Sequence, residues 1–203
     1  MQEMMLARAK ALLQSGDVQR VLGWQTGEFV YDVTPAVFET PEELDAKFVY
    51  NDFCGSNLSK YLVKESRKEG RVLVFLKPCD TYSFNQLIKE HRIVRENIYV
   101  IGVPCAGKTD GETLKALGLK GILGVKDAGD SFTVETLYGE KTVSKQEALP
   151  ERCRSCKSHK HMVYDELLGE EGEVLDSHRF DMVEKIESMS ADERFAFWQG
   201  ELS

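Results

Sequence analysis

The sequence lacks the features of several protein classes. It has no apolar run near the roughly 18 residues of a membrane-spanning helix, and its longest run, Val72–Leu76, is the length of a buried strand. Basic charge is in deficit, with 26 Lys and Arg against 34 Asp and Glu and a net charge of −8. That balance argues against binding to a phosphate backbone, which needs a basic face. The first residues lack the basic and apolar regions of a signal peptide. We therefore expect a cytoplasmic protein with no nucleic-acid partner and no membrane span.

The clearest pattern lies in the centre of the chain. An apolar strand is predicted over 71–76, a helix from Asp80 to Ile88, and a second apolar strand over 97–102. Strand, helix and strand in this order form a βαβ unit, whose strands are parallel. We predict an α/β fold with a small, partly parallel sheet built around this unit and flanked by helices.

The remaining elements are expected around that unit. Helices are predicted at 4–15, from Thr40 onward, at 57–69, ending at 184–189, and at 190–198, with a hairpin of strands at 18–24 and 28–33. Glycines punctuate 111–143, which favours loops with weak strands, and 145–160 looks irregular. We assign residues 1–175 to the α/β domain and 176–203 to a C-terminal helical extension.

Four of the five cysteines fall at positions that suit a metal centre. Cys79 follows the first central strand and Cys105 the second, each directly after a proline. Parallel strands end at one edge of the sheet, which is where open α/β sheets bind ligands. Cys153 and Cys156 form a CxxC pair. In the cytoplasm such cysteines are more often ligands than disulfides, and four thiolates suit either a [4Fe-4S] cluster or a structural Zn²⁺ ion.

Basic residues accompany these cysteines in an otherwise acidic chain, namely Lys77, Lys108, Arg152, Arg154 and Lys157. Positive charge lowers the pKa of a thiol, and it would offset the negative charge of a cluster with four thiolates. The fifth cysteine, Cys54, is expected at a helix start, as an activated thiol, a substitute ligand or an inert core residue. His159 and His161 follow the CxxC pair closely, and we interpret them as part of a solvated loop.

A second motif competes with the cysteines. Gly102–Thr109 fits the P-loop pattern G-x-x-x-x-G-K-[ST] and follows a strand. In that reading Lys108 would contact the outer phosphates of a nucleotide and Thr109 a Mg²⁺ ion. Gly111 and Gly118 make the segment after Thr109 a poor anchoring helix, so this reading is the weaker one.

Taken in order, the motifs Lys77-Pro78-Cys79-Asp80, Ile101–Cys105, and Cys153–Cys156 followed by Tyr164-Asp165 resemble the beta subunits of coenzyme F-420-reducing hydrogenases and formate dehydrogenases. The resemblance spans about residues 5–170. It implies a [4Fe-4S] cluster held by Cys79, Cys105, Cys153 and Cys156 beside a flavin. Family members hold the flavin with a Gly-Gly turn before the first helix, and this chain starts at Met1 without it, so FAD is expected only as an optional cofactor.

Larger relatives continue past a segment like Arg194–Trp198 into a ferredoxin-type domain, so this chain is expected to be a small subunit or part of a longer protein. The resemblance predicts an iron–sulfur electron-transfer subunit of an anaerobic oxidoreductase. It would relay electrons between a redox enzyme and a flavin or a ferredoxin-like partner, without being a complete enzyme alone. The alternatives are a structural zinc module for assembly and the P-loop nucleotide-binding protein.

Overall fold

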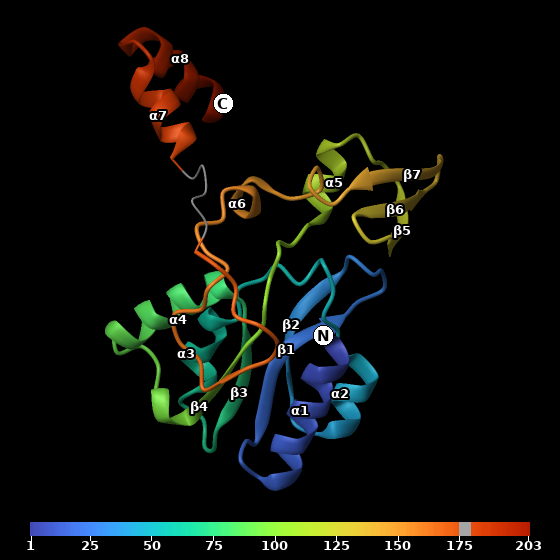
Figure 1. Cartoon of the computed structure of the whole chain (residues 1–203), viewed down its shortest axis with the longest axis vertical. Coiled ribbons are helices and arrows are strands. Elements are labelled where there is room, and N and C mark those ends of the chain that lie inside the picture. The colour runs from blue at the N-terminus through green and yellow to red at the C-terminus, as the bar shows by residue number, and fades with distance from the viewer. Residues whose placement is uncertain (175–179) are drawn as a thin grey trace.

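A computed structural model describes residues 1–174 and 180–203 (Figure 1). Its main sheet has five strands in the order β2-β1-β3-β4-β8. Only β2 runs antiparallel to its neighbour, whereas β1, β3, β4 and β8 pair in parallel. The bounds are β1 Arg20–Thr26, β2 Val33–Phe38, β3 Val72–Leu76, β4 Ile98–Gly102 and β8 Glu166–Leu167. The predicted α/β class with a partly parallel sheet is confirmed.

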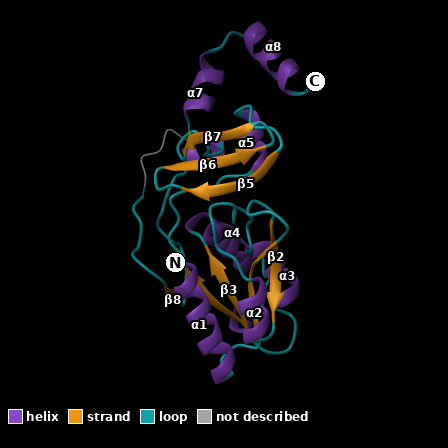
Figure 2. Ribbon diagram, turned by 90° about the vertical axis from the view of Figure 1, so that its right-hand side faces the viewer, coloured by secondary structure: helices purple, strands orange, loops and turns teal. Residues whose placement is uncertain are grey.

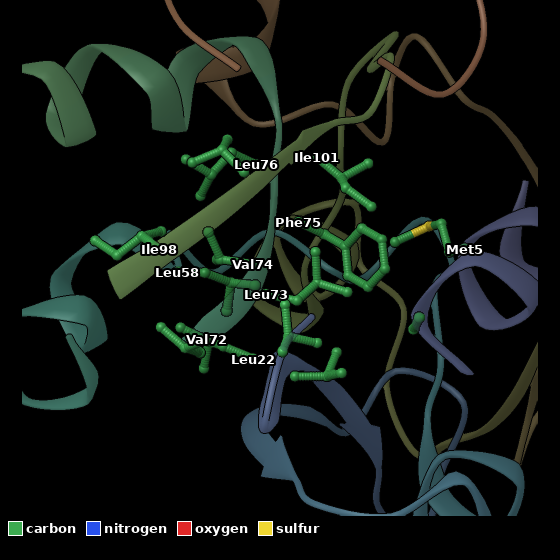
Figure 3. Close-up of a cluster of buried hydrophobic side chains, with 14 of the residues drawn as sticks. Met5, Leu22, Leu58, Val72, Leu73, Val74, Phe75, Leu76, Ile98 and Ile101 are labelled. Carbon is green, nitrogen blue, oxygen red and sulfur yellow. The ribbon is translucent and has the colours of Figure 1, made fainter. Parts of the chain in front are cut away.

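Helices cover both faces of this sheet. Figure 1 shows α1 (Gln2–Ser15) and α2 (Pro41–Lys47) on one side, and α3 (Leu62–Glu65) and α4 (Pro78–Lys89) on the other. Every residue of β3 is buried, which explains why its sequence is apolar throughout instead of alternating. Its side chains lie at the centre of the hydrophobic cluster, between Met5 of α1 and Leu58 of the loop before α3 (Figure 3).

The central βαβ unit has the predicted order, with small changes in its bounds. α4 begins at Pro78 instead of Asp80. Proline is favoured at the first helical position because its missing N–H would have no partner there. Asp80 lies at the third position and accepts a hydrogen bond from the Lys77 backbone N–H at 3.3 Å. A short 3-10 turn, Arg95–Asn97, then leads into β4.

Two predicted elements near the N-terminus differ in the structure. The second strand of the hairpin is at Val33–Phe38, and 28–32 form the turn, in which the Gly27 N–H donates to the Asp32 carbonyl at 2.6 Å. The helix expected over 57–69 is reduced to a 3-10 turn, Ser59–Tyr61, followed by the four residues of α3. Of the four residues whose spacing indicated that helix, Leu58, Leu62 and Glu65 are buried and Tyr61 is exposed.

The loops with weak strands expected over 111–143 form a second, ordered layer, in which the strands make a sheet of their own. α5 (Gly111–Ala116) precedes three antiparallel strands, β5 (Ile122–Asp127), β6 (Ser131–Thr136) and β7 (Gly139–Ser144). These strands have their own small core, formed by Phe53, Leu114, Leu119, Val125, Phe132, Val134 and Ala148. Figure 2 shows this sheet as separate from the main one.

The rest of the chain holds short elements. α6 (Glu151–Arg154) is a single turn within the segment predicted to be irregular. α7 (Asp181–Ser188) and α8 (Ala191–Glu201) form the C-terminal part, close to the predicted helices. The predicted domain boundary at 175/176 falls at residues outside the described ranges and stays a prediction. Among the described helices, none has the length and apolar character that crossing a membrane requires.

Candidate functional site

The carboxyl ends of β3 and β4 bring two cysteine motifs to the same level of the sheet. Leu76 pairs with Gly102 in the parallel register, and each strand is followed by its proline and cysteine. Cys79 lies in the first turn of α4, and Cys105 lies in the loop after β4. This is the sheet edge at which the sequence predicted a ligand site.

The CxxC pair closes the same site from a distant part of the chain. A cavity of about 240 Å³ is lined by both strand-end cysteines, Cys79 and Cys105, and by both cysteines of the pair, Cys153 and Cys156. The structure therefore brings together all four cysteines selected from the sequence, from three separate segments. The remaining lining residues are Gly55, Asn57, Lys77, Pro78, Asp80, Gly107, Lys108, Arg152, Ser158 and His159.

The spacing of the donors bears on which metal group the cavity suits. Within residues 1–174 and 180–203, no three His, Cys, Asp or Glu side chains are grouped so that they could hold one metal ion. A tetrahedral Zn²⁺ site with Zn–S bonds of about 2.3 Å needs its sulfurs about 3.8 Å apart. In a [4Fe-4S] cluster each cysteine binds a different iron, so the thiolates surround a larger body. Four thiols around one cavity match the ligand number of a [4Fe-4S] cluster, with one thiolate for each iron.

The pKa values of two cavity thiols, Cys79 and Cys105, are raised. Burial raises the pKa of Cys79 to about 12, with the neighbouring Asp80 carboxylate acting in the same direction and the Lys77 ammonium opposing it. Cys79 is nevertheless an exposed residue and lines the cavity. Burial also raises the pKa of Cys105, against the lowering effect of Lys108. The lysines lower the pKa of both thiols, as the sequence predicted, but desolvation outweighs their charge.

Two buried lysines, Lys77 and Lys108, line the cavity, and Lys77 forms an ion pair there. The Lys77 ammonium pairs with the Asp80 carboxylate at 2.8 Å, donates to the Ser56 carbonyl at 3.0 Å, and lies 4.6 Å from the centre of the Trp24 ring. Lys77 is 2% exposed and Asp80 1%. This pair joins the β3 end to the first turn of α4, and it fixes the position of Cys79 between its two members.

His161 is a buried residue next to the cavity, and the sequence analysis misjudged its surroundings. The solvated loop predicted for it is wrong, since its side chain is fully buried. Nε2 lies 3.2 Å from the Leu76 carbonyl and 3.1 Å from the Val103 carbonyl, and Nδ1 lies 2.9 Å from Oε1 of Glu171. The imidazole thus ties the ends of β3 and β4 to the segment after the CxxC pair. Its neighbour His159 is half-buried and lines the cavity.

Cys54 is separate from this group. It is buried, is not among the cavity-lining residues, and its sulfur accepts a hydrogen bond from the Asn51 backbone N–H at 3.3 Å. Burial raises the pKa of its thiol. The inert core residue is the reading that these contacts favour, among the three left open by the sequence.

The structure does not support the P-loop alternative. In a P-loop the Lys and the Ser or Thr begin a helix whose N–H groups surround the phosphates. Here the helix begins later, at Gly111, with Asp110 as its cap. The Lys108 ammonium donates to the Asn51 carbonyl at 2.9 Å, and the Thr109 backbone N–H donates to the Asp52 carbonyl at 2.8 Å.

Comparison with solved structures shows which class of fold this is. A chain of the F420-reducing [NiFe] hydrogenase complex from Methanosarcina barkeri superposes with a TM-score of 0.62 at 16% sequence identity, over 80% of this chain and 61% of that one. The chain therefore has the fold of a component of a hydrogenase complex. No family model matches the sequence.

Curated relatives give the more particular relationship. The chain is 31% identical over 104 residues to F420-dependent formate dehydrogenase 1 subunit beta of Methanococcus maripaludis, covering 51% of this chain and 27% of that protein. It is 29% identical over 162 residues to F420-dependent formate dehydrogenase subunit beta of Methanocaldococcus jannaschii, covering 73% and 42%. The predicted resemblance is confirmed: the chain is similar to the beta subunits of F420-dependent formate dehydrogenases, and it spans less than half the length of these two relatives.

Proposed function

We propose that this chain is an iron–sulfur electron-transfer subunit, or part of one, of a hydrogenase- or dehydrogenase-type oxidoreductase. Cys79, Cys105, Cys153 and Cys156 would hold one [4Fe-4S] cluster. The observation that carries the proposal is that these four cysteines, from three separate segments, line one cavity at the carboxyl edge of the sheet. The relatives named above are subunits of redox enzymes, which supports the same assignment.

The residues of the chain would have three tasks at this site. The cysteines supply the four thiolates, the Lys77–Asp80 pair positions Cys79, and the His161 imidazole keeps the ends of β3 and β4 in place. The bound cluster would supply one-electron chemistry. Its redox partner would be another subunit, or a flavin or ferredoxin-like domain, and the cytoplasmic location expected from the sequence belongs to this proposal.

Structural zinc is the second candidate for the same four thiols. The relatives named above are subunits of redox enzymes, which favours the cluster. Zinc would leave the chain without a redox role, because Zn²⁺ does not change oxidation state. The test must therefore identify the metal as well as the ligands.

The ligand set is tested by single Cys→Ser variants at the four positions, purified anaerobically and reconstituted with iron and sulfide. Wild-type protein should be brown, with about four irons per chain. Each of the four variants should lose most of its visible absorbance and iron. Cys54→Ala is the matched control, because it removes the one cysteine that does not line the cavity, and it should keep the cluster. Retention of a full cluster by two or more of the four Ser variants would contradict the ligand set.

A further inference from the structure

Lys108 is a buried cation without a counter-charge. The residue is 7% exposed, and its ammonium donates to the Asn51 carbonyl at 2.9 Å and lies 4.0 Å from the centre of the Tyr50 ring. No carboxylate among the described residues comes within the 4.0 Å of an ion pair with it. The nearest acidic side chain that acts on it, Asp52, is paired with Lys145 at 3.2 Å.

The contrast with Lys77 shows that this arrangement is unusual within the same site. Both lysines are buried, both lie against an aromatic ring, and both line the thiol cavity. Lys77 is neutralised by Asp80, whereas Lys108 is not. An unpaired buried charge is destabilising, and burial lowers the pKa of Lys108 accordingly. A carbonyl and a ring face reduce that cost without removing it.

The four cysteines that line the cavity would supply the missing negative charge when they bind a cluster. A cluster bound by four deprotonated cysteines carries net negative charge, and that charge grows by one on reduction. A fixed cation next to such a group stabilises the reduced form more than the oxidised form.

We propose that Lys108 is a positioning residue whose ammonium is the counter-charge of the group bound by the four cysteines, and that it raises the reduction potential of that group. The inference rests on the proposed function. Tyr50 supports it structurally, because its ring carries the ammonium while its hydroxyl donates to the Pro104 carbonyl at 3.3 Å, next to Cys105. One side chain thus fixes both the cation and the ligand loop.

The test is an anaerobic dithionite titration of the reconstituted full chain, comparing wild type with Lys108→Met. Loss of the charge should lower the equilibrium constant for one-electron reduction about tenfold, which corresponds to about 59 mV. Lys108→Arg should restore most of the wild-type potential. Lys157→Met is the matched control: it also removes an ammonium that lies over a tyrosine ring, that of Tyr82 at 3.7 Å, and it is adjacent to Cys156, but it is exposed. Solvent screening should keep its effect under about twofold.

A second measurement separates a functional role from a structural one. Because Lys108 is an unpaired buried charge, the apo form of Lys108→Met should unfold at the same denaturant concentration as wild type or at a higher one. If Lys108→Met failed to retain a cluster while Lys157→Met retained it, and the apo stability of Lys108→Met were intact, the role of Lys108 as a counter-charge would also be supported. An unchanged potential, or a clearly destabilised apo protein, would overturn this inference while leaving the ligand set untouched. Wild-type protein that never binds a cluster would overturn both proposals.

Discussion

Replacing His161 with alanine tests how the cysteine motifs are held in register. The imidazole contacts three oxygen atoms: the Leu76 and Val103 carbonyls at the ends of β3 and β4, and the Glu171 carboxylate. After truncation the Leu76 carbonyl keeps the Val103 N–H at 3.0 Å, and Glu171 keeps the His161 backbone N–H at 2.8 Å. The Val103 carbonyl loses its contact with His161 and has no other hydrogen bond to the residues that the structure describes.

The magnitude follows from these losses. A buried carbonyl left without a partner costs about 1–3 kcal/mol, and the void left by a fully buried ring adds to it. We expect His161→Ala to lower the free energy of unfolding of the apo protein by about 2–4 kcal/mol. Because the contacts lie at the base of both cysteine loops, the variant should also lose its reconstituted cluster faster than wild type.

The assay is urea unfolding of the apo protein with His159→Ala as the control. His159 is half-buried, lies two residues away and lines the same cavity, and its side chain has no hydrogen bond to the described residues. Its truncation should cost under about 1 kcal/mol. If His161→Ala were no more destabilising than His159→Ala, the role of His161 in tying the two strand ends together would be refuted.

Two further predictions concern titration of the same region. Burial alone would raise the pKa of Glu171, but the hydrogen bonds from His161 lower it below the ordinary 4.5. The stability that this shift contributes is present above pH 4.5 and is lost as the pH falls through the lowered pKa, so wild type should lose stability relative to Glu171→Gln below about pH 4.5. Parallel pH profiles of the urea midpoint for the two proteins would contradict this prediction. In the apo protein, the rate of Cys79 alkylation, measured by mass spectrometry, should rise about tenfold per pH unit between about pH 8 and 10, because the pKa of its thiol is raised to about 12. A rate that levels off near pH 9, as for a peptide cysteine, would show that the thiol is not desolvated.

The part of the fold that the sequence predicted is the part controlled by local signals. The β3–α4–β4 unit combines a wholly apolar strand with a proline at the helix start, and the position of both cysteines follows from its parallel register. The β5–β7 sheet was missed because glycines obscured it, although Ser131–Thr136 alternates in burial as a half-buried strand does. The positive-φ Gly139 begins the strand that completes it.

The sequence identified the candidate ligands of the site, but it did not predict their burial or their contacts with distant residues. Cysteine type and spacing identified Cys79, Cys105, Cys153 and Cys156, whereas the sign of the thiol pKa shifts depends on burial, which no local pattern reports. His161 was misread because its partners, Leu76 and Val103, are 85 and 58 residues away. Lys108 lines the cysteine cavity, as its place beside Cys105 suggested, but its contacts with Asn51 and Tyr50 were not visible in the sequence.

The most direct test of the central claim is iron and acid-labile sulfide analysis of wild-type protein that has been purified without exposure to oxygen. The four cysteines around the cavity predict about four irons and four sulfides per chain, with no stoichiometric zinc. Colourless protein containing one zinc ion per chain would contradict the account, since the same thiols would then serve a closed-shell metal with no electron to carry.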